Sequence, residues 1–364
     1  MKRLRLALII VTGLILLAGG GLWLARDRLA TAAMARLYAR ALGSDPIAAL
    51  PDGLHVGLCG SGAPMPDPTR AGPCTVIVAG RRMFVVDSGE GSVRKLSLMN
   101  LPPAQVSAVF LTHYHSDHIA DLGELMLQRW GGGAAQAPLP IYGPTGVVQV
   151  VQGFEAAYAL DEGYRIAHHG PKVMPPSGFG AVPHAFVADR AAPDVTLIDE
   201  PDLKVIAFPV DHQPVEPAVG YLFIYKGRRV VVSGDTAPSA RLEAAAKGAD
   251  VLVHEALAPN LVAIQRQAAL RAGRANLAAI FHDILGYHTT PEQAAAIAQR
   301  AGVRYLLLSH IIPPLPSRVF DGIFLGRTRQ IFHGPVRVGQ DGDFLSLPPG
   351  TTDIRRVNRL KAFQ

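Results

Sequence analysis

Cysteine is scarce in this 364-residue sequence. The two cysteines, Cys59 and Cys74, are too few for a disulfide-rich scaffold, and their spacing does not fit a zinc finger. The loop between them, GSGAPMPDPTRAGP, could return the chain as a hairpin and allow a single disulfide in an oxidising compartment. Two unpaired cysteines in a hydrophobic core are an equally good interpretation, so the sequence leaves both open.

Charge is also sparse, at 18% of residues, whereas hydrophobic residues make up 49%. This balance excludes a largely disordered chain and allows one large domain or two ordinary ones. The net charge of +6 arises partly from basic residues near the two chain ends. Within the main domain no run combines clustered Lys or Arg with aromatic residues, which argues against a nucleic-acid-binding surface.

One stretch has no charge at all, the twenty residues from Leu6 to Ala25. A helix of this length crosses about 30 Å of hydrocarbon. The apolar region of a cleaved signal peptide is usually only about 7–15 residues long, so we predict an uncleaved transmembrane anchor over residues 1–28. The alternative is a removed signal sequence, since Ala30-Thr31-Ala32 also fits a cleavage site.

The flanks of this segment predict its orientation. By the positive-inside rule, basic residues ahead of the segment place the N-terminus in the cytoplasm and the main domain outside, in a periplasm if the cell is bacterial. These residues are Lys2, Arg3 and Arg5. Arginines on the far side weaken the prediction; they are Arg26, Arg28, Arg36 and Arg40.

The rest of the chain divides by pattern. Residues 29–52 predict a helical stalk or linker, with the helix ending at Gly43, and residues 351–364 form a basic tail. Between them, residues 53–350 alternate short β-branched runs with helix-like segments, which indicates an α/β domain. The segment 154–201 has weak periodicity and is expected to be an irregular insertion near a site. Its His168-His169 pair is expected to be polar surface rather than a metal site.

Several apolar runs end in His or Asp: VFLTHYH, VVVSGD, VLVHE and LLLSH. In a mostly parallel sheet such strand ends gather along one edge, so they predict a pocket there. The first run continues into H-x-H-x-D-H, that is His113, His115, Asp117 and His118. Imidazole nitrogens and a carboxylate, with no thiolate nearby, are a donor set suited to zinc. Four donors in six positions predict a metal site.

One loop cannot complete two coordination shells, so other strand ends must contribute. The candidates are His212 in PVDHQP, Asp235 in VSGDTA and His310 in LLSHII. Each alone has a structural interpretation as a turn residue, a strand-end cap or a helix-start residue.

Together these residues resemble the metallo-β-lactamase fold superfamily over about residues 53–348. Asp87 in FVVDSGEG matches its first motif, the H-x-H-x-D-H run its second, and His212, Asp235 and His310 its third to fifth. GSGAPMPDPTR, SGDTAPSARLEAAAKGADVLVHEAL and YHTTPEQAAAIAQRAGVRYLLLSH are similar to segments of the tRNase Z-like and arylsulfatase-like branch. The resemblance implies a four-layer αββα sandwich, here with an N-terminal transmembrane helix.

The resemblance also implies two zinc ions. The first would be held by His113, His115 and His212, the second by Asp117, His118 and His310, and Asp235 would bridge them. Two dications repel, and a bridging carboxylate with a bridging hydroxide, the attacking nucleophile, offsets that repulsion. Asp117 could also orient this nucleophile.

Other roles follow from the same resemblance. His288 in GYHTTPE matches the residue that protonates the leaving group in tRNase Z relatives; its structural alternative is a cap for a helix predicted at 291–301, with Thr289-Thr290 as possible caps. His254 and Glu255 in LVHEA, like Asp87, would orient metal-binding histidines by contacting the imidazole nitrogen that does not bind metal.

The expected function is a membrane-anchored dinuclear zinc hydrolase acting on a phosphoester of a small molecule, with a homodimer possible. The sequence lacks the glycine- and lysine-rich arm of tRNase Z enzymes, so a nucleic-acid substrate is disfavoured but not excluded. Arylsulfatase and β-lactamase activity are alternatives on the same site. A diiron redox protein, which typically has Glu in place of His115, and a non-catalytic scaffold are the alternatives from other classes.

Overall fold

The computed structural model describes residues 2–191 and 193–360, and the chain divides into two compact units, Met1–Ala49 and Leu50–Gln364. The N-terminal unit is mainly one helix, α1 (Lys2–Leu42), which runs through both the predicted anchor and most of the predicted stalk. With a mean hydropathy of 2.3 in its most apolar window, α1 is long and apolar enough to cross a membrane, a test that a signal sequence also passes.

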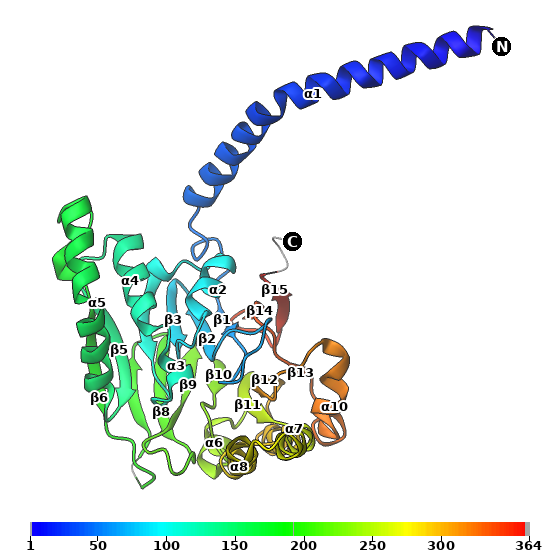
Figure 1. The fold of residues 1–364 in the computed structure, drawn as a ribbon. Coiled ribbons are helices and arrows are strands. Elements are labelled where there is room, and N and C mark those ends of the chain that lie inside the picture. Colours follow the sequence, from blue (N-terminus) through cyan, green and yellow to red (C-terminus); the bar gives the residue numbers. More distant parts are fainter. Residues whose placement is uncertain (1, 192, 361–364) are drawn as a thin grey trace. The chain divides into compact units, whose positions relative to one another are not determined.

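The described part of the C-terminal unit contains two β-sheets (Figure 1). The first has eight strands in the order β15-β14-β1-β2-β3-β4-β5-β6. These are β1 (Leu54–Gly60), β2 (Cys74–Ala79), β3 (Arg82–Val86), β4 (Val106–Phe110), β5 (Leu139–Pro144), β6 (Ala181–Phe186), β14 (Asp343–Leu347) and β15 (Arg355–Asn358). The edge strand β15 lies within the segment predicted to be a basic tail.

The second sheet has seven strands in the order β13-β12-β11-β10-β9-β8-β7. They are β7 (Val195–Asp199), β8 (Leu203–Pro209), β9 (Val219–Tyr225), β10 (Arg228–Val232), β11 (Val251–Leu257), β12 (Tyr305–Ile312) and β13 (Val336–Val338). The strands β10 to β13 are parallel, as are β3 to β6 in the first sheet.

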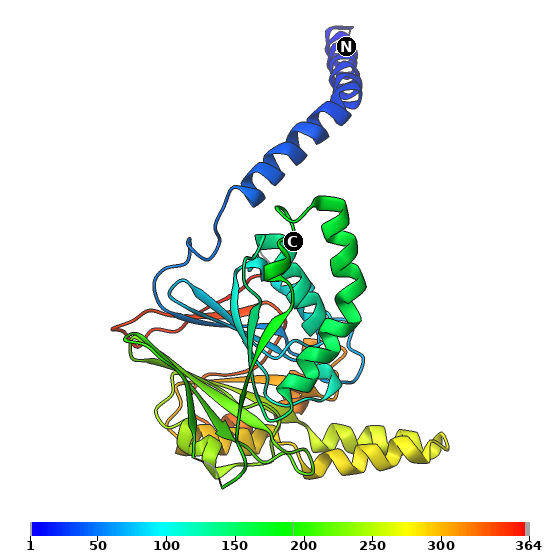
Figure 2. The same ribbon diagram turned by 90° about the vertical axis from the view of Figure 1, so that its left-hand side faces the viewer.

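Helices lie against both sheets (Figures 1 and 2). On the first sheet α5 (Val147–His169) packs against β5, β6 and α4 (Leu122–Gly133), and on the second α6 (Ala240–Ala245) and α9 (Pro291–Arg300) pack against β8, β11 and β12. The other helices are α2 (Ser92–Leu98), α3 (Ser116–Ile119), α7 (Pro259–Arg271), α8 (Ala275–Asp283), α10 (Asp321–Leu325) and α11 (Thr328–Ile331). Short 3-10 turns complete the set at Pro103–Gln105, Pro176–Gly178, Ile284–Gly286 and Arg318–Phe320. The expected α/β class with two sheets is confirmed.

A hydrophobic core fills the space between the sheets. Phe84 and Phe110 from the first sheet meet Phe223 from the second, with the Phe110 and Phe223 ring centroids 5.4 Å apart in a T-shaped pair. Such pairs add about 0.5–1.5 kcal/mol beyond the burial of the rings themselves. This core holds the two sheets together and thereby sets the distance between the strand ends that carry the site.

Gly234, two residues after the end of β10, packs closely against the start of the loop after β4. Its φ of +62° lies in the left-handed region. A Cβ there would lie 2.7 Å from the Val219 carbonyl oxygen and 3.0 Å from the Thr112 Cβ. Only glycine combines this conformation with this close approach. It therefore allows Asp235 to sit beside the loop after β4.

The expectation of an irregular insertion from Phe154 was wrong for its first part. Residues up to His169 belong to α5, a helix of 23 residues. Only Val147 and Val151 of this helix are buried, so it has almost no apolar stripe and its 3.6-residue period is weak in the sequence. The helix predicted at 291–301 is confirmed as α9, where Thr290 and Gln293 form a capping box.

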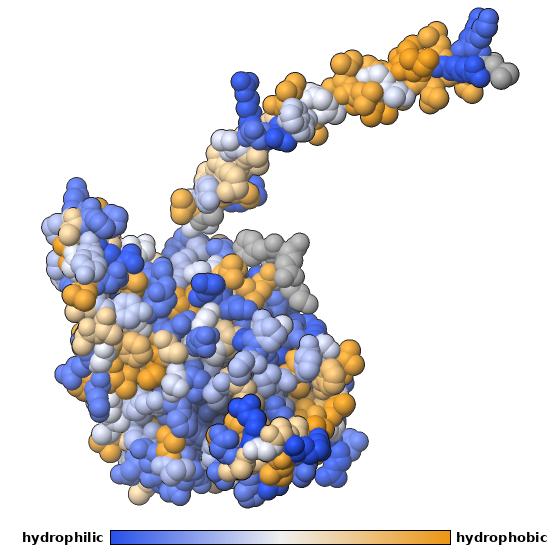
Figure 3. Space-filling model, in the orientation of Figure 1, coloured by the Kyte–Doolittle hydropathy of each residue, from blue (hydrophilic) through white to orange (hydrophobic). Residues whose placement is uncertain are grey.

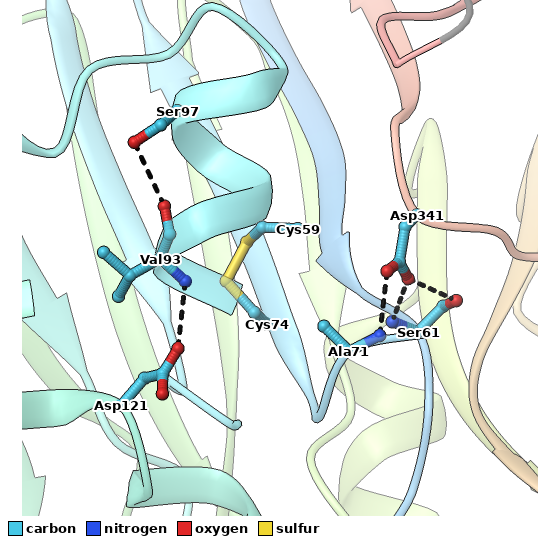
Figure 4. Close-up of a disulfide and its surroundings, with 8 residues drawn as sticks. All are labelled: Cys59, Ser61, Ala71, Cys74, Val93, Ser97, Asp121 and Asp341. Carbon is cyan, nitrogen blue, oxygen red and sulfur yellow. Dashed lines mark hydrogen bonds between the residues drawn. A yellow bond between two sulfur atoms is a disulfide. The ribbon is translucent and has the colours of Figure 1, made fainter. Parts of the chain in front are cut away.

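Cys59 and Cys74 form a disulfide between the end of β1 and the start of β2 (Figure 4). The loop between these strands is also held by the Asp341 carboxylate. This carboxylate accepts hydrogen bonds from the amide and hydroxyl of Ser61 and from the amide of Ala71 (Figure 4). Of the two interpretations that the sequence allowed, the structure has the bonded one.

Candidate metal centre

Polar residues from four strand ends meet at one edge of the paired sheets. The loop after β4 and the short helix α3 supply His113, His115, Asp117 and His118. The segment after β8 supplies His212, the turn after β10 supplies Asp235, and β12 supplies His310. Thus the structure brings together all seven side chains predicted as metal ligands.

Four of these side chains form a first donor group: His113, His115, His212 and Asp235 have ligand atoms within 4.8 Å of one another. Nε2 of His113 lies 3.0 Å from Nδ1 of His115. Nε2 of His212 lies 3.5 Å from the same Nδ1. The three imidazoles therefore converge as one set of nitrogen donors.

A second donor group contains Asp117, His118 and His310. The Asp117 Oδ2 atom lies 3.5 Å from Nε2 of His118 and 3.3 Å from Nε2 of His310. One carboxylate oxygen and two imidazole nitrogens thus face a common point, as the first group does.

The Asp235 carboxylate lies between the two groups. Its Oδ2 is 3.2 Å from Nε2 of His310 and 3.3 Å from Nε2 of His118. It is also 3.9 Å from Nε2 of His113 and 4.0 Å from Nε2 of His212. A single carboxylate that reaches both donor groups is the arrangement expected of a bridging ligand.

In the described part of the chain, one buried donor atom lacks a hydrogen-bond partner, which is expected of a metal ligand. Nε2 of His118 is buried without a hydrogen-bond partner among the described residues. Buried polar atoms are normally hydrogen-bonded, so an unpartnered nitrogen aimed at two carboxylates points to a ligand between them. Nitrogen and oxygen donors without sulfur suit zinc, although imidazole and carboxylate also bind iron.

Two residues beneath the centre orient its imidazoles. Asp87 Oδ2 lies 2.8 Å from Nδ1 of His118, and the same carboxylate accepts hydrogen bonds from the amide and hydroxyl of Thr112. The Thr112 hydroxyl is in turn 3.1 Å from Nδ1 of His113. Metal-binding histidines usually need such a partner on the outer nitrogen, so the predicted orienting role of Asp87 agrees with its contacts.

The backbone is strained at two of these positions. Asp87 and His310 adopt φ values of 60° and 47°, in the left-handed region that residues other than glycine seldom occupy. Such conformations persist where the surrounding structure enforces them, and they cluster at functional sites. Here they aim one orienting and one donor side chain at the centre.

His288 also lies at the centre, in a third group with Asp235 and His310. Nδ1 of His288 is 3.0 Å from Oε1 of Glu255, which also accepts hydrogen bonds from the amides of Thr236 and Thr289. Glu255 thus orients His288. His254 belongs to none of the three donor groups, and its Nδ1 contacts the Glu255 carbonyl. Because neighbouring side chains of a strand point to opposite faces, His254 points away from the face on which Glu255 meets His288.

Burial and local charges favour the metal-binding form of four donor side chains, whereas at His118 the carboxylates of Asp235, Asp87 and Asp117 outweigh burial and raise the pKa of the imidazole well above its usual value. Burial lowers the pKa of His113 well below its usual value, and it lowers the pKa of His115 and His212 in the same direction. Burial opposes the ionised form of Asp235, but His310, His118 and His113 outweigh it and hold the pKa of that carboxyl well below its usual value. Neutral imidazoles and an ionised carboxylate are the forms that bind metal.

Two contributors to the centre were missed in the sequence. Thr112 could have been found from its place directly before His113. The other is the backbone carbonyl of Tyr287, which lies 3.1 Å from Nδ1 of His212. A backbone carbonyl has no sequence signal, because every residue has one.

Comparison with known proteins agrees with this geometry. Residues 82–311 match the family described as "Beta-lactamase superfamily domain". The chain belongs to the metallo-β-lactamase superfamily. The chain is therefore a metal-dependent hydrolase.

Two similar proteins are named ribonuclease Z. This chain is 37% identical over 300 residues to one from Mycolicibacterium gilvum (strain PYR-GCK), covering 82% of this chain and 97% of the relative. It is 39% identical over 290 residues to a ribonuclease Z from Mycobacterium avium (strain 104), covering 79% and 96%.

Solved structures support the same superfamily fold. Human tRNase Z, short form, aligns with a TM-score of 0.58 at 24% identity, covering 81% of this chain and 99% of that one. The metallo-β-lactamase fold protein YhfI from Bacillus subtilis aligns with a TM-score of 0.57 at 22% identity, covering 80% and 99%. At these identities the likeness concerns the fold alone.

Proposed function

We propose that this chain is a dinuclear zinc hydrolase that cleaves a phosphoester bond in a small-molecule substrate. The observation that carries the proposal is the position of the Asp235 carboxylate, within 4.0 Å of imidazole nitrogens in both donor groups. The first ion would bind His113, His115 and His212, the second would bind Asp117, His118 and His310, and Asp235 would bind both. When bound, two zinc ions polarise the scissile bond and lower the pKa of a water to about 7.

The side chains around this centre divide the remaining work. Asp117 orients the attacking water in addition to binding metal, and His288 donates a proton to the leaving group. Burial disfavours the charged form of His288, but Glu255 outweighs it and raises the pKa of the imidazole, which keeps a proton available there. Asp87 keeps the His118 ring in position through Nδ1.

RNA phosphodiester cleavage is the second candidate, favoured by the relatives named ribonuclease Z. The helix α5 and the segment after it, which correspond to the RNA-binding arm of tRNase Z enzymes, are not strongly basic. Because phosphate contacts dominate nucleic-acid affinity, this composition favours a small-molecule substrate over RNA. Aryl sulfates and β-lactams could use the same donor set, but no contact described above favours either over a phosphoester.

We also propose that α1 anchors the protein in a membrane, with the catalytic unit on the extracytoplasmic side. The basic flank of α1 and its apolar length support this orientation. The Cys59–Cys74 disulfide supports it too, because such bonds persist in oxidising compartments.

The test compares wild type with Asp235→Ala, and with Asp202→Ala as a control at an exposed carboxylate before β8. We expect two zinc ions per chain in wild type and in the control, and fewer in Asp235→Ala. A turnover panel of bis(p-nitrophenyl) phosphate, an aryl sulfate, a chromogenic cephalosporin and a tRNA precursor identifies the bond class. Turnover of the phosphodiester that survives in Asp235→Ala, or iron with a visible absorption band, would contradict the proposal.

A further inference from the structure

A hollow of about 550 Å³ lies along one face of α5. The helix residues that line it recur every three or four positions and therefore share that face. They are Gly146, which precedes the first residue of α5, and Gln149, Val150, Gly153, Phe154 and Ala157. Small-molecule sites typically measure about 300–1,000 Å³, so the hollow has the size of a ligand site. On the same side of the molecule, apolar surface gathers beside α5 (Figure 3).

The hollow adjoins the loop that carries four of the metal donors, although no donor side chain lines it. Its other wall consists of Tyr114 and Ile119, which belong to the metal-binding loop itself. Tyr114 stands between His113 and His115, and His115 is the exposed member of the donor set. A substrate that reaches the ions past His115 therefore has the hollow directly beside it.

The wall at Tyr114 is held in place. Its hydroxyl donates a hydrogen bond to the Pro144 carbonyl. A Cβ at Gly146, where φ is +111°, would lie 2.9 Å from the Tyr114 ring, so the glycine lets the ring pack closely against the turn before α5. The hollow is therefore formed before any ligand arrives, which reduces the cost of binding.

The lining is apolar and uncharged. The side chains of Ile119, Val150, Phe154 and Ala157 provide hydrocarbon surface, and Gly153 leaves space between them. The only polar side chains are the Gln149 amide and the Tyr114 hydroxyl, which already has a partner. Apolar surface of this kind gains free energy by excluding water, so the lining favours an alkyl or aryl group.

The charges on α5 argue against RNA in the hollow. This helix contains three acidic residues, Glu155, Asp161 and Glu162, but only one arginine, Arg165. The rings of Tyr114 and Phe154 could stack on bases, but the neighbouring acidic groups would repel phosphates.

We infer that the hollow binds an apolar arm, alkyl or aryl, of the phosphoester that is cleaved at the metal centre. The inference rests on the proposed function and narrows its substrate class to amphiphilic phosphoesters: the phosphate lies at the ions and the apolar arm lies against α5.

Glycines on α5 provide a matched pair of variants. A Cβ at Gly153 or at Gly163 would meet no atom within 4 Å, so leucine fits at either position. Gly153→Leu fills the hollow, whereas Gly163→Leu makes the same change on the same helix outside it. Both remove a helix-interior glycine, so they should alter helix stability alike.

The measurement is calorimetric titration of n-alkyl phosphates, from methyl to hexyl, into the full-length metal-loaded protein in lipid nanodiscs. In wild type and Gly163→Leu we expect affinity to rise with chain length, by up to about fourfold per buried methylene and so by up to about a thousandfold over the series. In Gly153→Leu the rise should fall below about tenfold.

Three results would overturn the inference: no chain-length dependence in wild type, the same dependence in both variants, or a Gly153→Leu variant that loses affinity for a tRNA precursor but not for hexyl phosphate. If alkyl phosphates bind as expected while no phosphoester is turned over, the hollow stands and the proposed function fails. If phosphoesters are turned over and the alkyl series is flat, the proposed function stands and this inference fails.

Discussion

At the scale of single residues, His288 is the position where binding and catalysis are hardest to separate. Its Nδ1 lies 3.0 Å from Glu255 Oε1, which leaves Nε2 to act on the substrate side. It also shares a donor group with Asp235 and His310, so it could instead bind metal. The two roles predict different effects of one substitution.

We expect His288→Ala to lower kcat by about 10²–10⁴-fold while the metal content remains that of wild type, because general acid catalysis contributes about this much. The loss should be greater for an alkyl leaving group than for p-nitrophenolate, which departs without a proton. Steady-state kinetics on the two substrate types, with metal analysis of the same samples, check this. Loss of a metal ion from the variant would instead make His288 a ligand.

His55, remote from the centre, permits a test of pH-dependent stability. Its Nδ1 lies 2.9 Å from the Ser346 hydroxyl and its Nε2 lies 3.0 Å from the Pro51 carbonyl. Burial lowers the pKa of this imidazole from its usual 6.5. The unfolded chain therefore takes up this proton at higher pH than the folded chain does, and stability is lost as pH falls below about 6.5.

We expect His55→Asn to be less stable than wild type at pH 7.5, because packing is lost, and the gap in Tm to narrow by pH 5. Asparagine has no proton to take up, so only wild type suffers the acid-dependent loss at this position. Thermal melts over this pH range, with the exposed His333→Asn as a parallel control, measure the gap. A gap that stays constant or widens would show that His55 is not the group responsible.

At the scale of elements, the β1–β2 connection is held at two points. The disulfide joins the strands, and the buried Asp341 carboxylate holds Ser61 and Ala71 while lying 3.1 Å from the Lys95 ammonium. Cys74 also lines a small cavity beside His118 and Asp235. The connection therefore supports one side of the metal centre.

We expect the double variant Cys59→Ala/Cys74→Ala to lose about 3 kcal/mol of unfolding free energy, the value for a cross-link that closes a loop of about 15 residues. Denaturant titration with and without dithiothreitol measures the loss. Reductant should destabilise wild type by a similar amount and leave the variant unchanged. A wild type that is indifferent to reductant would show that the bond does not form in solution.

At the scale of the whole molecule, the catalytic unit contains its own core. The clusters that hold the two sheets and their helices draw on residues from Leu54 onward. The helix α1 belongs to the other compact unit, exposes its apolar side chains and supplies none of the candidate metal donors.

We expect a chain beginning at Leu50 to remain soluble, to keep its zinc and to turn over a small soluble phosphoester at the full-length rate. The full-length protein should stay in the membrane pellet after alkaline carbonate extraction. Cell fractionation and mass spectrometry of the N-terminus check both expectations. Recovery of a shortened soluble product from the full-length gene would identify α1 as a cleaved signal sequence.

The sequence by itself predicted the fold class and all seven side chains that the structure brings together as candidate metal donors. Four donors lie within six residues after a strand, and the other donors lie at strand ends that carry His or Asp. Such patterns are predictable because the type and spacing of these ligands depend only on short segments of sequence. The α9 capping box was also predictable, since Thr290 and Gln293 interact across one helical turn.

Only the tertiary structure decided that Asp235 reaches both donor groups, since that depends on the close approach of two sheets at Gly234. It also decided between paired and unpaired cysteines, and it placed Tyr287 and Glu255 behind His212 and His288. The helix α5 escaped prediction because a helix with two buried residues has no strong apolar period. The hollow beside α5 forms where Tyr114 and Ile119 meet the start of this helix, and a contact between separate segments cannot be predicted from local sequence patterns.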